Sequence, residues 1–148
     1  METNPSLELL KTVLGKEITT SPSPFANWLK VKLIEAHKGF VKVKLAVRED
    51  MTNPAGSMHG GVIAALMDEL MGMAVFTLGR DTFFTTINIQ SDFLRAAMKN
   101  DVITAEAKVV REGKNIINVE CSIFNYAGEL LAKGGSNLLR TDINAKNT

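Results

Sequence analysis

The chain has 148 residues, of which 45% are hydrophobic and 22% charged, and its formal net charge is +1 at pH 7. This length fits one globular domain. A nucleic-acid-binding protein carries a strong excess of Lys and Arg, which the balanced charge excludes. The single cysteine, Cys121, excludes an intramolecular disulfide and suits a reducing compartment. The first residues lack the order of a secretory signal, so we expect a cytoplasmic protein.

The N-terminal part of the chain predicts a short helix that lies outside the main domain. Asn4 is suited to an N-cap, Pro5 to a first turn and Gly15 to a helix end. Residues 21–24, Ser-Pro-Ser-Pro, then interrupt regular structure. We therefore divide the chain into an N-terminal extension at 1–24, a main domain at 25–141 and a polar tail at 142–148.

Strand patterns of period two flank one long apolar segment. Residues 29–33 and 41–45 alternate apolar residues with lysine and predict an antiparallel hairpin. Residues 62–78 are apolar on every side of a helical wheel, which predicts a helix buried all round. Four further strands are predicted at 84–94, 102–112, 115–125 and 130–139. Because one sheet cannot cover every face of this helix, we expect a strongly curled sheet or a second subunit.

The triplet His59-Gly60-Gly61 precedes this helix. A helix start leaves backbone N–H groups unpaired, and glycines let a foreign oxygen approach them closely. The triplet is thus a candidate oxyanion site, although the same pattern is typical of a tight turn without a ligand. Asp68 lies about two turns further on in an apolar helix, where a carboxylate is costly unless it is paired or functional. Glu69 is adjacent, and periodicity alone does not say which acid faces a cleft.

Residues 53–61, Asn-Pro-Ala-Gly-Ser-Met-His-Gly-Gly, followed by Asp68, resemble the hotdog-fold thioesterases. The closest group is that of the phenylacetic-acid-degradation and hydroxybenzoyl-CoA thioesterases. The resemblance covers roughly residues 28–140, in element order as well as motif. It implies an α+β hotdog fold with a six-stranded antiparallel sheet wrapped around a long central helix. It also implies a homodimer or homotetramer whose active site lies between subunits, so that a monomer should be inactive.

The resemblance also implies a role for each residue of the motif. The Gly60 N–H would polarise the thioester carbonyl. Asp68 would be the general base or the nucleophile. Asn53 would orient the water or the thioester, His59 would sit beside the carbonyl, and Thr86 would help to place water.

The contacts of the substrate are predicted less directly. The resemblance favours Asp68 over Glu69 as the catalytic acid. It also implies that cations at a strand end and in a turn would bind the phosphates of coenzyme A. The candidate substrate-binding residues are Gly61, Thr85, Arg95, Arg111 and Lys114. The methionines Met67, Met71 and Met73 are candidates to line an adaptable acyl pocket, although methionine at helical spacing is typical of plain core.

We therefore predict an acyl-CoA thioesterase that hydrolyses a thioester to a carboxylic acid and free CoA. The alternatives are a non-catalytic acyl-CoA or acyl-carrier binding protein, and a hotdog enoyl-CoA hydratase or dehydratase. His37 and His59 lack a ligand cluster at metal spacing, so no metal site is expected. No nucleotide-binding fingerprint suggests a bound cofactor, and neither nucleic acid nor membrane is an expected partner.

Overall fold

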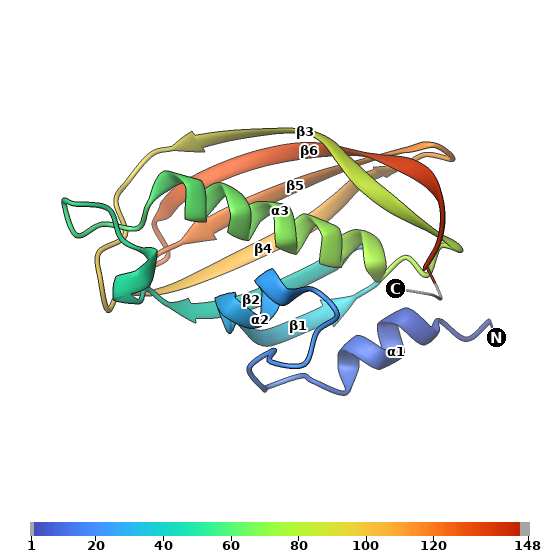
Figure 1. The fold of residues 1–148 in the computed structure, drawn as a ribbon, viewed down its shortest axis with the longest axis horizontal. Coiled ribbons are helices and arrows are strands. Elements are labelled where there is room, and N and C mark those ends of the chain that lie inside the picture. The colour runs from blue at the N-terminus through green and yellow to red at the C-terminus, as the bar shows by residue number, and fades with distance from the viewer. Residues whose placement is uncertain (1, 146–148) are drawn as a thin grey trace.

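The computed structural model describes residues 2–145. Its helices are α1 (Pro5–Lys11), α2 (Pro24–Leu29) and α3 (Gly60–Phe76), with a short 3-10 turn at Glu49–Met51. Its strands are β1 (Lys32–His37), β2 (Phe40–Ala46), β3 (Thr82–Phe93), β4 (Val102–Glu112), β5 (Ile116–Phe124) and β6 (Leu130–Asn144). They form one six-stranded antiparallel sheet in the order β1-β2-β4-β5-β6-β3. The sheet curves around α3 (Figure 1), which confirms the predicted hotdog architecture.

Two element boundaries differ from the prediction. Residues 29–31 were expected in a strand, but Leu29 ends α2, because Ser23 caps that helix and Pro24 occupies its first turn. At the other end, β6 continues past the predicted 139 to Asn144, which pairs with Thr82. Backbone pairing with β3 therefore orders residues 142–144, which had been assigned to the polar tail. Of the remaining tail residues, Ala145 is described, and 146–148 lie outside the described part of the chain.

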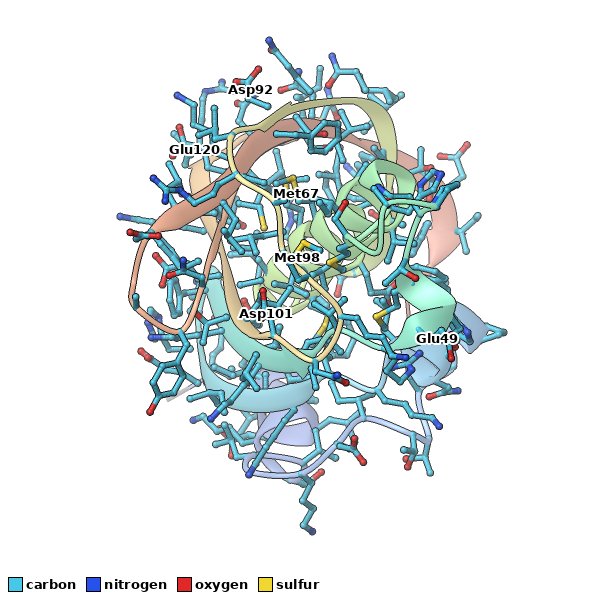
Figure 2. The ribbon with its side chains drawn as sticks, turned by 90° about the vertical axis from the view of Figure 1, so that its left-hand side faces the viewer. Glu49, Met67, Asp92, Met98, Asp101 and Glu120 are labelled. Carbon is cyan, nitrogen blue, oxygen red and sulfur yellow. The ribbon has the colours of Figure 1, made fainter. Side chains whose placement is uncertain are left out.

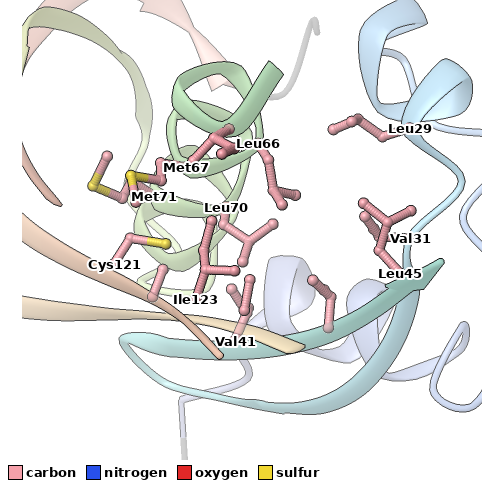
Figure 3. Packing of buried hydrophobic residues seen from close by; sticks show 14 of the residues in the cluster. Leu29, Val31, Val41, Leu45, Leu66, Met67, Leu70, Met71, Cys121 and Ile123 are labelled. Carbon is pink, nitrogen blue, oxygen red and sulfur yellow. The ribbon is translucent and has the colours of Figure 1, made fainter. Parts of the chain in front are cut away.

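The core lies between α3 and the concave face of the sheet. Helix α3 buries a row of apolar side chains there: Ile63, Leu66, Met67, Leu70, Met71, Ala74 and Val75. Figure 3 shows Met67 and Met71 within this core beside Cys121 of β5. Of the two alternatives for these methionines, an acyl pocket or plain core, their full burial fits plain core, and Met73 also packs against the core, partly buried. Burial, with a smaller effect of Glu106, raises the pKa of the Cys121 thiol to about 12, which makes it a structural residue.

The N-terminal extension covers the β1 edge of the sheet. The N–H of Gly15 donates to the carbonyl of Leu33 at 2.8 Å, and the N–H of Ile18 donates to the carbonyl of Val31 at 2.9 Å. Backbone groups that would otherwise be open at this edge are thereby paired. Asn4 ties the extension to α3, because its Oδ1 caps α1 and its Nδ2 donates to the carbonyl of Thr77 at 2.7 Å.

The opposite edge is β3, which pairs with β6 on one side and has no strand on its other side within residues 2–145. Large apolar side chains along it are exposed, among them Phe83, Ile87 and Phe93. One stripe of α3 that contains Gly61, Asp68 and Phe76 is exposed as well. The prediction that α3 is buried all round is therefore wrong for a single chain, because the sheet and the extension leave this stripe uncovered. Within residues 2–145, no helix is long and apolar enough to span a bilayer.

Candidate active site

His59 sets the start of α3 by capping it. Its Nδ1 accepts a hydrogen bond from the N–H of Gly61 at 2.9 Å, and its carbonyl accepts from Val62 and Ile63 at 2.9 and 3.0 Å. A ring nitrogen that accepts carries no proton, so this geometry fits the neutral tautomer with its proton on Nε2. A Cβ on Gly61 would lie 3.0 Å from His59 Nδ1, which explains why a glycine follows the cap closely. His59 thus positions the helix start.

The Gly60 N–H is unpaired in the described part of the chain, since none of residues 2–145 accepts from it. It stands at the N-terminus of a 17-residue helix, where the aligned peptide dipoles favour negative charge. The N–H of the predicted substrate residue Gly61 is instead occupied by His59. Gly60 is therefore the backbone donor that this helix start offers to a ligand.

Asp68 and Glu69 point to different parts of the molecule. Asp68 Oδ1 accepts from Thr86 Oγ1 of β3 at 2.7 Å, and Asp68 is exposed, not buried as its apolar surroundings in sequence suggested. Glu69 is half-buried and accepts from Ser23 Oγ at 3.3 Å. Burial raises the pKa of Glu69, which the bond from Ser23 partly offsets. Thr85 is exposed on the sheet face opposite to Thr86, because neighbouring strand residues alternate.

Asn53 organises the loop before His59. Its Oδ1 accepts from the N–H groups of Ala55 and Ser57 at 3.0 and 3.2 Å, and its Nδ2 donates to Ser57 Oγ at 2.9 Å. The N–H of His59 donates to the carbonyl of Met51 at 2.8 Å, which fixes the far side of the loop. In a single chain the Asn53 amide is thus engaged within its own loop.

Gly60 and Asp68 lie too far apart along α3 to act on the same atom. Eight residues at the helical rise of 1.5 Å separate them by roughly 12 Å. Because β3 runs antiparallel to α3, Thr86 lies beside Asp68 while Phe93 lies beside Gly60. One chain therefore presents two half-sites, a backbone donor at one end and a carboxylate with a hydroxyl at the other.

The three predicted cations are not brought together. Arg95 follows β3 near the start of α3 and pairs with Glu129 Oε2 at 3.1 Å. Arg111 and Lys114 lie at the β4–β5 turn, where Arg80 donates to the carbonyl of Lys114 at 2.9 Å. This turn is at the C-terminal end of α3, because Gly39 bonds both Thr77 Oγ1 and the N–H of Val109. Among the residues described, no three His, Cys, Asp or Glu side chains gather as a metal site.

Phe93 is a site residue that the sequence did not reveal. A Cβ on Gly60 would lie 3.4 Å from its ring, so the ring packs directly against the helix start. In the sequence, Phe93 is one apolar residue in an alternating strand, a pattern that predicts core. In the structure, Phe93 is 56% exposed because β3 is the open edge of the sheet. This exposure places Phe93 on a surface beside the free N–H of Gly60.

Comparison with known proteins shows the family of this chain. Residues 55–132 match the model of the thioesterase superfamily. A Saccharolobus solfataricus protein named as a candidate esterase is 32% identical over 133 residues, which span 88% of this chain and 94% of that protein. Human acyl-coenzyme A thioesterase 13 is 29% identical over 106 residues, 71% of this chain and 76% of its own length.

The fold comparison points to the same group. The E. coli PaaI protein from the phenylacetic acid degradation operon superposes with a TM-score of 0.77 at 25% identity, covering 83% of this chain and 88% of that one. The matched residues include both His59-Gly60-Gly61 and Asp68, within the range of the family model. The chain belongs to the thioesterase superfamily, as its motif predicted, and it is an enzyme that hydrolyses thioesters.

Proposed function

We propose that this enzyme hydrolyses acyl-CoA thioesters to a carboxylic acid and free CoA. The observation that carries the proposal is that one helix presents both an unoccupied N–H, on Gly60 at its start, and a carboxylate, Asp68, that Thr86 holds. The human relative, named an acyl-coenzyme A thioesterase, supports CoA as the thiol. The number of subunits, the cytoplasmic location, the domain limits and the lack of a bound cofactor stay predictions.

The chemistry follows from the two half-sites. The thioester oxygen accepts from the Gly60 N–H, which stabilises the negative charge that develops as the carbonyl carbon is attacked. Asp68 either takes a proton from the attacking water or attacks the carbon itself, and the C–S bond then breaks. In the second route a water hydrolyses the resulting acyl–Asp68 anhydride, which releases the acid and restores the carboxylate. The CoA thiolate leaves and takes up a proton. Thr86, which donates to Asp68, orients the carboxylate for either route.

A dimer joins the two half-sites. A two-fold axis that crosses β3 between Thr86 and Phe93 would pair two open β3 edges antiparallel and reverse the direction of the partner's helix. The partner's Asp68 would then approach Gly60, which closes the roughly 12 Å gap within one chain. Gly72, four residues after Asp68 on the same side of α3, is partly exposed, and a Cβ there would meet nothing within 4 Å, so a second chain has room to approach.

The test is thiol release from aromatic and aliphatic acyl-CoA thioesters. We expect Asp68→Asn to lower kcat/KM by about a hundredfold or more, since it removes the basic oxygen. Glu69→Gln is the matched control, because that neighbouring acid faces Ser23 and not β3. Full activity of Asp68→Asn would overturn the mechanism. Tight binding of acyl-CoA without turnover by the wild type would instead favour a non-catalytic binding protein.

A further inference from the structure

Phe93 closes strand β3 with its ring against the helix start. A Cβ on Gly60 would lie 3.4, 3.5 and 3.8 Å from the ring atoms Cε2, Cζ and Cδ2. The backbone beyond Phe93 is fixed, because the N–H groups of Leu94 and Arg95 both donate to the carbonyl of Leu131, at 2.8 and 3.0 Å. The ring is thus held beside the unpaired N–H of Gly60.

The ring lies on the same side of the sheet as α3. Phe93 pairs across the ladder with Ala132, which is fully buried under the helix, so the two side chains share the concave face. The ring is nevertheless 56% exposed, because β3 is the open edge. One side of the ring therefore lies against Gly60, and the rest is open in a single chain, on the side where the proposed dimer would bring the partner's half-site.

Two further exposed apolar residues, Leu94 and Met98, follow Phe93 in the sequence. Leu94 is 55% and Met98 is 45% exposed, and Met98 lies within reach of the loop before His59, 3.9 Å from a Cβ on Gly56. Figure 2 looks onto this end of the fold, with Met98 near the middle of the view. Exposed apolar side chains beside a free backbone donor are typical of a surface that a ligand covers.

We propose that Phe93 is the wall against which the aliphatic part of the substrate beside the reacting carbonyl packs. This inference rests on the proposed thioesterase function and deepens it. Both the acyl chain and the pantetheine arm of CoA present methylene groups on either side of the thioester, so the shared chemistry is a flexible apolar chain. Packing on the ring removes such methylenes from water and thereby selects substrates by the length of this chain.

The experiment varies the two sides of the thioester separately. One series keeps CoA and lengthens the acyl group from acetyl to decanoyl; the other keeps a hexanoyl group and shortens the thiol from CoA to pantetheine and to N-acetylcysteamine. We expect Phe93→Ala to reduce the preference for the longer member by about tenfold in one of the series. The series affected shows which arm crosses the ring. Phe93→Leu should keep most of the preference, since it restores apolar surface.

Controls separate this role from others. Tyr126, 88% exposed in the β5–β6 turn, supplies the matched aromatic-to-alanine control, Tyr126→Ala. If the chain-length preferences of Phe93→Ala stay within twofold of the wild type in both series, Phe93 does not pack against the substrate. The proposal would also be overturned if light scattering showed that Phe93→Ala is a monomer. A wild type without turnover on any thioester would defeat the proposed function instead. Binding of a non-hydrolysable decyl-CoA thioether, expected to weaken about tenfold in Phe93→Ala, then tests the wall alone.

Discussion

His59 Nδ1 accepts the N–H of Gly61 at 2.9 Å, and this single bond decides which backbone donor the helix start offers. Of the two glycine donors, one is used within the chain, and the other, on Gly60, stays open among the described residues. The cap also fixes the ring, so His59 contributes geometry to the site. The role of the open donor can be tested by a substitution that removes the N–H of Gly60.

We expect Gly60→Pro to abolish most activity while leaving α3 intact. Proline is well tolerated at the first helical position, and His59 already has extended backbone angles of −60° and 133°, which suit a residue before proline. The substitution deletes the N–H, and losing an oxyanion donor costs roughly 10²–10³ in kcat. Gly60→Ala adds the same Cβ and keeps the donor, so its loss should be much smaller. Equal losses in the two variants would show that crowding against Phe93, not the N–H, is responsible.

Two inactive variants should complement each other if each active site is shared between chains. In a heterodimer of Asp68→Asn with Gly60→Pro, one site keeps both an intact Gly60 and an intact Asp68. Random exchange of subunits makes about half of the dimers heterodimers, and each heterodimer has one functional site out of two. About a quarter of the wild-type activity should therefore return. The measurement is thiol release after the separately purified variants are mixed and allowed to exchange subunits. No recovery despite proven exchange would place Gly60 and Asp68 of one chain in the same site.

The sequence predicted the sheet, the long helix and the motif at its start, because these depend on local periodicity and capping. Periodicity did not predict which of the two adjacent acids faces the open edge, and only the family resemblance favoured Asp68. That choice depends on Ser23, which lies 46 residues from Glu69 in sequence and donates a hydrogen bond to its carboxylate. Thr86, by contrast, holds Asp68 toward the open edge of the sheet. Such pairings across the fold leave no local pattern.

The exposure of residues near the site was also beyond the sequence. An apolar helix indicates burial, yet the stripe around Asp68 is open, because the strand beside it is the last of the sheet. Strand order, which no alternating pattern encodes, therefore decides that Phe93 lines a surface and that Met67 lies in the core.

Glu69 should make the folded state less stable as pH rises. Burial raises its folded pKa above the ordinary value of 4.5. Below pH 4.5 the proton is bound in both the folded and the unfolded state, and the cost of burying charge is absent. As pH rises through the raised folded pKa, the buried carboxyl must ionise, and stability is lost. Glu69→Gln keeps an acceptor for Ser23 and should raise Tm at neutral pH relative to wild type, with a smaller gain near pH 4. A gain in Tm that is the same at both pH values would contradict this cause.

The two edges of the sheet should respond differently to charge. Ile87 and Ile34 are 50% and 42% exposed, and each lies at an irregularity in its strand, one on β3 and the other on β1. Because the N-terminal extension pairs the first part of the β1 edge, at Val31 and Leu33, β3 is the longer edge left open to a second chain within residues 2–145. Ile87→Glu should therefore shift the protein to monomers and abolish thiol release at low protein concentration, while Ile34→Glu should change neither.

Light scattering at the assay concentration measures the first effect and thiol release the second. Raising the concentration of Ile87→Glu should restore dimers and activity together, since mass action opposes a weakened interface. A fully active Ile87→Glu monomer would mean that one chain completes the site alone, despite the eight residues of helix between Gly60 and Asp68. Loss of dimers in Ile34→Glu instead would move the interface to the β1 edge, where the extension would have to detach first.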